Sequence, residues 1–149
     1  MVGAGPARGT LIDLIHELEL RGRVLLPGVF SDAQGVLAAA DVFVLPSQQE
    51  GMSIALLEAM AAGVPVVASD IPGNRAVVEH ERHGLLAPYG DADALAQAIS
   101  RIFEYRHLAR KLAVAARSRV EQDFSIGRTA REHVELFSRL IAARSAAAR

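Results

Sequence analysis

The chain has 149 residues, of which 51% are apolar, and its 16 Lys plus Arg against 17 Asp plus Glu give a formal net charge of −1. This length fits one ordinary domain, and the absence of a basic excess argues against nucleic-acid binding. The sequence has no cysteine, which excludes disulfides, thiolate nucleophiles and cysteine-based zinc sites and fits a reducing, cytoplasmic location.

Residues 1–6 (MVGAGP) have the pattern of a strand end that runs into a glycine turn. The spacing resembles the start of a G-x-G-x-x-G dinucleotide motif, but the third glycine position is Arg8. The turn is therefore either a tight strand-to-helix connection or a phosphate cradle. A helix is predicted directly after it, because apolar side chains recur at helical spacing over residues 9–20.

Short apolar runs then alternate with helical patterns. The runs are continuous rather than alternating and are bounded by Gly or Pro, which is typical of buried parallel strands. Strand, helix, strand, helix at this spacing predicts an α/β fold: a three-layer, Rossmann-like parallel sheet with helices on both faces. The predicted strands are 23–27, 42–46, 65–68 and 84–88, and the predicted helices between them are 31–40 (with Ser31 and Asp32 as N-cap candidates), 53–62 and 74–79.

The pattern changes after Gly90, where strands end and three amphipathic helices follow. Residues 1–90 are thus predicted to form a βα core and residues 91–149 a helical C-terminal extension of a single domain, 1–149. The most apolar stretch, 52–68, is interrupted by Glu58, Gly63 and Pro65, so no membrane span is expected. The three helices are predicted at 91–103, 107–122 and 126–143, with a frayed tail over 144–149.

A polar loop between the predicted strand 42–46 and the predicted helix 53–62 carries the chemistry. Ligands of open parallel sheets bind outside the carboxyl ends of the strands, and a helix N-terminus there favours a phosphate. Glu50 and Glu58 flank this position, and carboxylates are poor phosphate ligands but good acceptors for hydroxyls. A ligand with hydroxyls at both ends and a diphosphate in the middle is a nucleotide sugar.

Two interpretations of these glutamates remain open. In the functional one, Glu58 lies within an apolar surround and both carboxylates face the ligand. In the other, Glu50 is a solvated loop residue, and Glu58 is a helix residue paired with an arginine, because acidic residues near helix N-termini are common for dipole reasons.

The ordered motifs resemble a known family. Glu50 and Glu58 form an E-x7-E motif, with ADVFVLPS before it and EAMAAGVPVVASD around and after its second glutamate. The turns VGAGP, PG at 27–28, GLL at 84–86 and GD at 90–91 follow in family order. The chain resembles, over nearly its whole length, the donor-binding half of the group 1 (GT4-type) retaining glycosyltransferases, which have the GT-B fold.

The resemblance implies roles for matching positions. Glu50 is expected to hold donor-sugar hydroxyls without attacking the sugar, and Glu58 to accept the ribose hydroxyls. Backbone contacts to the diphosphate and sugar are expected from Gly51, Met52 and Ser53. The backbone near Val29 is expected to lie against the edge of the base. Gly3 and Ala4 are expected to line the nucleotide side of the donor site. Neither a metal nor another cofactor is expected.

Two parts of the family pattern are absent from the sequence: the acceptor domain, and the first βα unit of the donor domain with its diphosphate-neutralising Arg and Lys. The chain is therefore expected to be N-terminally truncated and inactive alone. The alternative function is a non-catalytic module that binds a nucleotide or a partner chain. In the family the last helix crosses toward the acceptor domain, so Phe137, Leu140 and Ile141 are expected to be exposed or covered by an acceptor domain or a second copy; peripheral membrane contact is expected only through the missing domain.

One further segment, His80-Glu81-Arg82-His83, has a superficial metal-ligand spacing. It follows a predicted short helix and precedes a glycine turn in a strongly charged stretch. We therefore interpret it as a solvated loop rather than a metal site.

Overall fold

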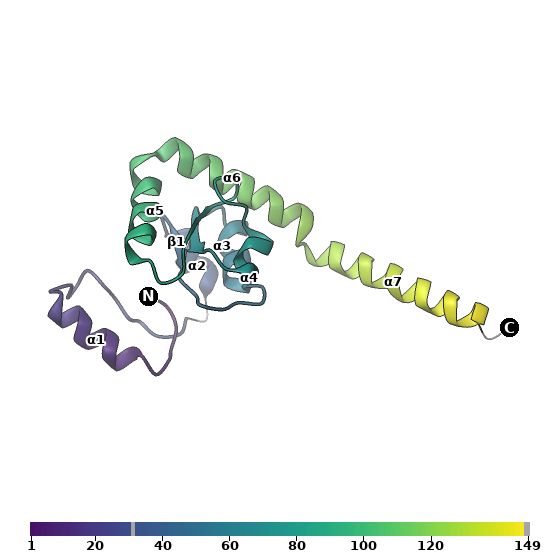
Figure 1. Cartoon of the computed structure of the whole chain (residues 1–149), viewed down its shortest axis with the longest axis horizontal. Coiled ribbons are helices and arrows are strands. Elements are labelled where there is room, and N and C mark those ends of the chain that lie inside the picture. The colour runs from purple at the N-terminus through teal and green to yellow at the C-terminus, as the bar shows by residue number, and fades with distance from the viewer. Residues whose placement is uncertain (31, 148–149) are drawn as a thin grey trace. The chain divides into compact units, whose positions relative to one another are not determined.

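The computed structural model describes residues 1–30 and 32–147 (Figure 1). The chain divides into two compact units, Met1–Val36 and Leu37–Arg149. Each unit is described by itself below.

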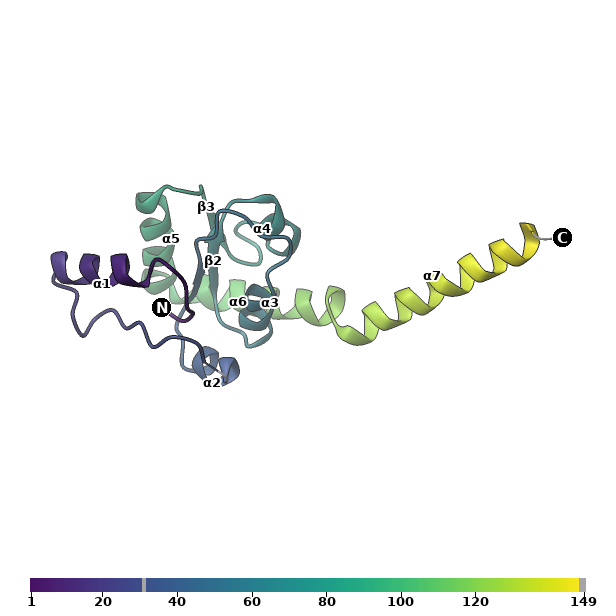
Figure 2. The ribbon, with the colours of Figure 1, turned by 90° about the horizontal axis from the view of Figure 1, so that it is seen from below.

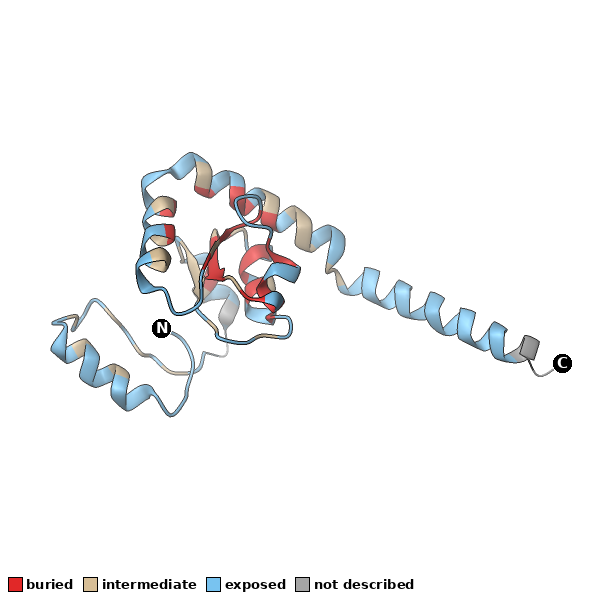
Figure 3. Cartoon of the chain, viewed as in Figure 1, coloured by how far each residue is buried: buried red, intermediate tan, exposed pale blue. Residues whose placement is uncertain are grey.

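The first unit is built around helix α1 (Arg8–Glu17), and α2 (Ala33–Ala38) begins near its end. The strand predicted over 23–27 is wrong: this segment forms no regular strand, and its neighbourhood pairs only through the isolated bridges Val2↔Gly28 and Arg21↔Val24. An apolar run becomes a strand only where a neighbouring strand completes its hydrogen bonds. None of the described residues of this unit is buried (Figure 3).

The second unit contains a parallel sheet of three strands, β1 (Phe43–Leu45), β2 (Val66–Ser69) and β3 (Leu85–Ala87), in the spatial order β1-β2-β3. Val67 at the centre of the sheet pairs with Val44 on one side and Leu85 on the other. All four residues of β2 are buried, as a central parallel strand requires. The predicted strands 42–46, 65–68 and 84–88 are therefore confirmed.

Two apolar clusters cover opposite faces of this sheet, because successive residues of a strand point to opposite sides. Val66 and Ala68 pack with α3 (Ile54–Ala61) and α4 (Pro72–Val77), and Val67 packs with α5 (Ala92–Glu104). Helix α6 (Arg106–Asp123) contributes to both clusters (Figure 2). The predicted three-layer α/β architecture is confirmed.

The helix ends follow the sequence signals. Ser53 caps α3, and Asp91 caps α5 by accepting a hydrogen bond from the Ala94 N–H at 2.8 Å. Asp32 accepts one from the Gly35 N–H at 2.9 Å, whereas the other N-cap candidate, Ser31, lies outside the described residues.

The C-terminal extension ends in the long helix α7 (Ile126–Ala147), so the predicted fraying from residue 144 is wrong as far as residue 147. The last two residues of that predicted tail lie outside the described part of the chain. Every side chain from Ile126 to Arg144 is exposed (Figure 3). None of the described helices is both long and apolar enough to cross a membrane.

Candidate functional site

The loop of residues 46–53 leaves the carboxyl end of β1 and leads into α3. Ser53 ends this loop in an extended conformation, and its Oγ accepts a hydrogen bond from the Leu56 N–H at 3.4 Å. Its carbonyl oxygen accepts from the Leu57 N–H at 3.2 Å. The loop therefore delivers the chain to the positive end of an eight-residue helix at the ligand edge of the sheet.

Glu50 lies in this loop with a half-buried side chain. The Ser47 hydroxyl donates a hydrogen bond to Oε1 of Glu50 at 2.7 Å. Glu50 is thus not a freely solvated loop residue, because one oxygen of its carboxylate is held from within the same loop. The neighbouring Gly51 and Met52 are exposed.

The loop is tied to the next strand by buried polar groups. The Ser69 hydroxyl, at the end of β2, donates a hydrogen bond to the carbonyl oxygen of Ser47. Asn74 in α4 donates from Nδ2 to the carbonyl oxygen of Ser69 at 2.8 Å and lies 3.4 Å from the Ser69 hydroxyl. Ser69 and Asn74 are both buried.

Helix α4 also touches the loop directly. A Cβ atom added to Gly73 would overlap the carbonyl oxygen of Glu50 and lie 2.7 Å from that of Gly51. No side chain fits at such a separation, so the backbone of α4 lies against the Glu50–Gly51 peptide because residue 73 is glycine.

Glu58 lies on the exposed side of α3, between Leu57 and the buried Ala59. The expected apolar surround of Glu58 is therefore wrong: the buried side chains of α3 point to the sheet and α6, and Glu58 points to solvent. No ion pair of the described residues includes Glu58, so the alternative of an arginine partner finds no support there.

A cavity of about 220 Å³ opens at the carboxyl ends of the three strands. Pro46 follows β1, Ser69 ends β2, and Tyr89 follows β3. The cavity lies at the edge where parallel sheets bind ligands, beside the loop that carries Glu50.

The segment after β2 carries an exposed ion pair on the same edge. Arg75 Nε lies 2.5 Å from Oδ1 of Asp70, and its NH2 group lies 2.9 Å from Oδ2. The hydrogen bond from Arg75 holds the pKa of Asp70 below its usual value. The guanidinium of Arg75 is thus paired with the carboxylate of Asp70.

Gly3, Ala4 and Val29 lie in the first unit. The N–H of Gly3 donates to the carbonyl oxygen of Gly28 at 2.8 Å, so the turn of residues 3–6 lies beside the peptide that leads to Val29. Gly28 has a φ of 89°, a conformation that favours glycine. Val29 itself is exposed.

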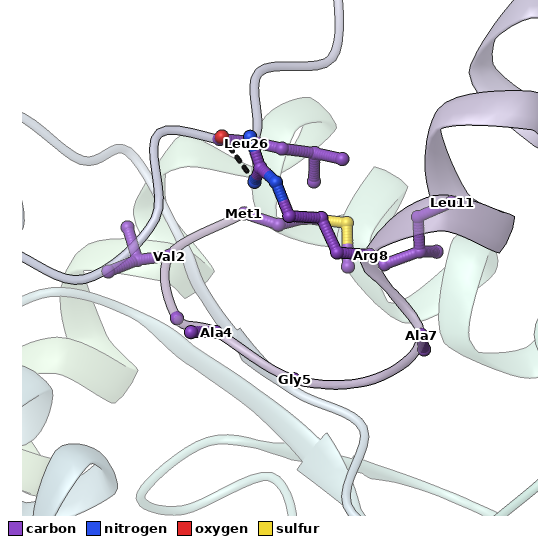
Figure 4. Close-up of a pocket in the computed structure, with 9 residues that line it drawn as sticks. Met1, Val2, Ala4, Gly5, Ala7, Arg8, Leu11 and Leu26 are labelled. Atoms are coloured by element: carbon purple, nitrogen blue, oxygen red, sulfur yellow. Dashed lines mark hydrogen bonds between the residues drawn. The ribbon is translucent and has the colours of Figure 1, made fainter.

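The same turn lines a cavity of about 210 Å³ together with Leu11 and Leu26 (Figure 4). Arg8, at the start of α1, donates a hydrogen bond to the carbonyl oxygen of Leu26 at 2.8 Å across this cavity. Gly3 and Ala4 thus line a hollow within their own unit, and Val29 is not among the residues that line it.

We expected the segment at 80–83 to be a solvated loop, but part of it is buried. His83 is buried, and its Nδ1 accepts from the Glu79 N–H at 3.3 Å. His80 Nδ1 accepts from the Leu86 N–H at 2.9 Å. Both imidazoles therefore have a structural contact to the backbone.

The sequence analysis missed the residues that support Glu50. The hydrogen bond between Ser47 and Glu50 is local, because the two residues are three apart in the same loop. The contacts of Ser69 and Gly73 with the loop join segments more than 20 residues apart, so no local pattern contains them.

Comparison with known proteins gives a consistent result. The family model described as "Glycosyl transferases group 1" matches residues 1–105. Among curated proteins, the amylovoran biosynthesis glycosyltransferase AmsK of Erwinia amylovora is 35% identical over 148 residues, which cover 94% of this chain and 36% of AmsK.

Two solved structures extend the similarity to the fold. Sucrose-phosphate synthase from Thermosynechococcus elongatus superposes with a TM-score of 0.86 at 36% identity, over 95% of this chain and 38% of that one. Anabaena HepE in complex with UDP-glucose superposes with a TM-score of 0.86 at 29% identity, over 92% of this chain and 39% of that one. The chain thus spans well under half of the length of each of these proteins.

Proposed function

Since the chain belongs to the group 1 glycosyl transferases, which have the GT-B fold, we propose that it is the donor-binding part of a retaining glycosyltransferase. It binds a nucleoside-diphosphate sugar, and with an acceptor domain it transfers the sugar to an acceptor. The observation that carries the proposal is the loop of residues 46–53, which presents a held carboxylate and a capped helix start at the ligand edge of a parallel sheet. The HepE complex with UDP-glucose supports this ligand class.

The proposal assigns one part of the donor to each group. The backbone of Gly51, Met52 and Ser53 contacts the diphosphate and sugar, where the start of α3 favours negative charge. The exposed carboxylate of Glu58 accepts the ribose hydroxyls, and Glu50 accepts hydroxyls of the sugar. Within the first unit, Gly3, Ala4 and the backbone of Val29 line the base side.

In the proposed reaction the bond from the anomeric carbon to the diphosphate breaks, and the acceptor oxygen bonds to that carbon from the same face. The acceptor proton passes to the departing diphosphate, so no covalent enzyme intermediate forms. Glu50 orients and stabilises the sugar and does not attack it. The proposal includes neither a metal nor another cofactor. We also propose that the protein is located in the cytoplasm.

Binding measurements test the proposal. The 149-residue chain is titrated by calorimetry with UDP-glucose, UDP-galactose, UDP-N-acetylglucosamine and GDP-mannose, each beside its free nucleotide. Glu58→Ala is expected to weaken the nucleotide and the nucleotide sugar alike, by at least tenfold, because hydrogen bonds to a charged group contribute about 1.5–3 kcal/mol. Glu50→Gln is expected to weaken only the nucleotide sugar.

The matched control is Glu104→Ala, which removes an exposed glutamate of α5 that the proposal does not use. A wild-type chain that binds none of these ligands at millimolar concentration would contradict the donor-site interpretation. Assays of sugar transfer with and without a supplied acceptor domain then separate a transferase from a module that only binds nucleotides.

A further inference from the structure

The carboxylate of Glu50 is held by a polar chain that begins in a different part of the fold. Ser47 donates to Oε1 of Glu50 at 2.7 Å and is itself fixed through its carbonyl oxygen by the hydroxyl of Ser69. Asn74 donates to the carbonyl oxygen of Ser69 at 2.8 Å. The loop, the end of β2 and helix α4 are thereby joined behind one carboxylate.

The inner part of this chain, formed by Ser69 and Asn74, is buried. Ser69 is 3% exposed and Asn74 is fully buried, so water does not compete for their hydrogen bonds. A hydroxyl has one proton, and because the Ser69 proton is donated to Ser47, the Ser69 oxygen is left to accept from Asn74 Nδ2 at 3.4 Å. The direction of each hydrogen bond in the chain is therefore set.

The side-chain amide of Asn74 is oriented with Nδ2 toward Ser69, and this orientation leaves its Oδ1 without a hydrogen bond. Its Oδ1 is a buried side-chain atom without a hydrogen-bond partner, the one such atom among the described residues. Turning the amide over would place Oδ1 against the carbonyl oxygen of Ser69, so the side chain leaves Oδ1 unpaired and keeps Nδ2 on Ser69.

Gly73 fixes the same loop from its backbone side. A Cβ at this position would overlap the Glu50 carbonyl oxygen and lie 2.7 Å from that of Gly51. The peptide that carries Glu50 is thus limited on one side by α4, while Ser47 holds its carboxylate on the other.

We propose that Ser47 is a positioning residue for Glu50, supported by Ser69, Asn74 and Gly73, and that it sets the affinity for the sugar part of the donor but not for the nucleotide part. This inference rests on the proposed function, in which Glu50 accepts sugar hydroxyls. Ser47 leaves Oε2 of Glu50 to the ligand and restricts the carboxylate to one orientation, so less ordering remains when the sugar binds.

The test compares a nucleotide sugar with its own nucleotide. Ser47→Ala removes the hydroxyl, Ser47→Thr retains it, and Ser100→Ala is the matched control on the exposed side of α5. Each chain is titrated with the tightest-binding donor among UDP-glucose, UDP-galactose, UDP-N-acetylglucosamine and GDP-mannose, and with the corresponding UDP or GDP. Thermal unfolding of each variant is recorded in parallel.

Ser47→Ala is expected to raise the Kd of the nucleotide sugar about tenfold and to change the Kd of the nucleotide less than twofold. Ser47→Thr is expected to restore binding, which a loss of packing alone would not explain. Gly73→Ala is expected to weaken the nucleotide sugar and the nucleotide alike, since its Cβ displaces the peptides of both Glu50 and Gly51.

Three outcomes would overturn the inference. Equal weakening of both ligands by Ser47→Ala would show a structural role only. Sugar-specific loss in Glu50→Gln without any in Ser47→Ala would leave the proposed function standing and remove the positioning role. A wild-type chain that binds no donor would overturn the proposed function and this inference with it.

Discussion

Glu50 and Glu58 are the two glutamates of the E-x7-E motif, but their surroundings in the structure differ. Glu50 is half-buried and accepts a hydrogen bond from Ser47, whereas Glu58 is exposed on α3. A held carboxylate presents its free oxygen in one direction, which suits selection among sugar hydroxyls. An exposed carboxylate on a helix reaches a ribose without reorganisation of the loop. The proposed division of roles agrees with this difference.

His83 is a buried titratable group outside the candidate site. Burial lowers the pKa of His83, and the charges of Arg119 and Arg82 lower it further, while Glu79 and Asp123 oppose the shift. The folded state therefore holds this imidazole neutral at a pH where the unfolded chain binds a proton.

The pH dependence of stability follows from the sign of this shift. Above the ordinary pKa of 6.5 His83 is neutral in both states, and its contribution to stability is complete. As the pH falls below that value the unfolded state takes up the proton first, so the free energy of unfolding decreases by up to about 1.4 kcal/mol per pH unit until the lowered folded pKa is reached. Urea unfolding at pH 7, 6 and 5 measures this slope.

Replacing the imidazole isolates its effect. His83→Gln is expected to flatten the curve between pH 7 and 5, whereas His107→Gln, an exposed position on α6, is expected to leave the slope unchanged. The lowered pKa values of Asp70 and Glu81 affect stability only at more acidic pH. Parallel curves for the wild-type chain and His83→Gln would contradict the assignment.

At the level of elements, the sequence predicted local features well and long-range pairing less well. The runs at 42–46 and 65–68 became strands because each has a partner in the sheet, whereas the run at 23–27, which also carries three consecutive apolar residues, forms no regular strand. Loop 46–53 was located from its neighbours in the chain. Its contacts with Ser69 and Gly73 depend on how the strands assemble, which no local pattern contains.

Helix α6 connects the two faces of the sheet. Its Ala116 packs in the cluster on the α3 side, and its Ala109 and Leu112 pack in the cluster on the α5 side. Loss of packing on this helix is therefore expected to destabilise the whole second unit rather than one local segment.

Leu112→Ala tests this expectation. Leu112 is fully buried, so truncation is expected to lower the free energy of unfolding by about 2–5 kcal/mol. Val114→Ala on the same helix is the matched control. Because Val114 is 66% exposed, this variant is expected to leave the free energy of unfolding nearly unchanged. Denaturant unfolding followed by circular dichroism measures both. Similar midpoints for the two variants would refute the assigned role of α6.

At the scale of the whole molecule, burial is concentrated in the second unit. Every buried side chain that the structure describes lies between residues 37 and 149. The family match nevertheless runs from residue 1 to residue 105 and so crosses both units.

The same scale includes the exposed apolar side chains of α7. Val134, Phe137 and Leu140 recur at helical spacing and are 64%, 56% and 57% exposed. Contiguous exposed apolar surface of this kind favours association, and a second copy of the chain is the partner present in a purified sample. We therefore predict that the chain self-associates as its concentration rises.

Sedimentation velocity over a concentration series measures this association. Phe137→Asp is expected to shift the chain toward monomer and to reduce binding of a fluorescent apolar dye, because a charge in the shared surface is costly to desolvate. Ala142→Asp is the matched control, since this exposed position lies on the side of α7 that faces away from Phe137 and Leu140. A wild-type chain that sediments as a monomer at every concentration and binds no dye would show that these side chains do not form a contact surface between copies.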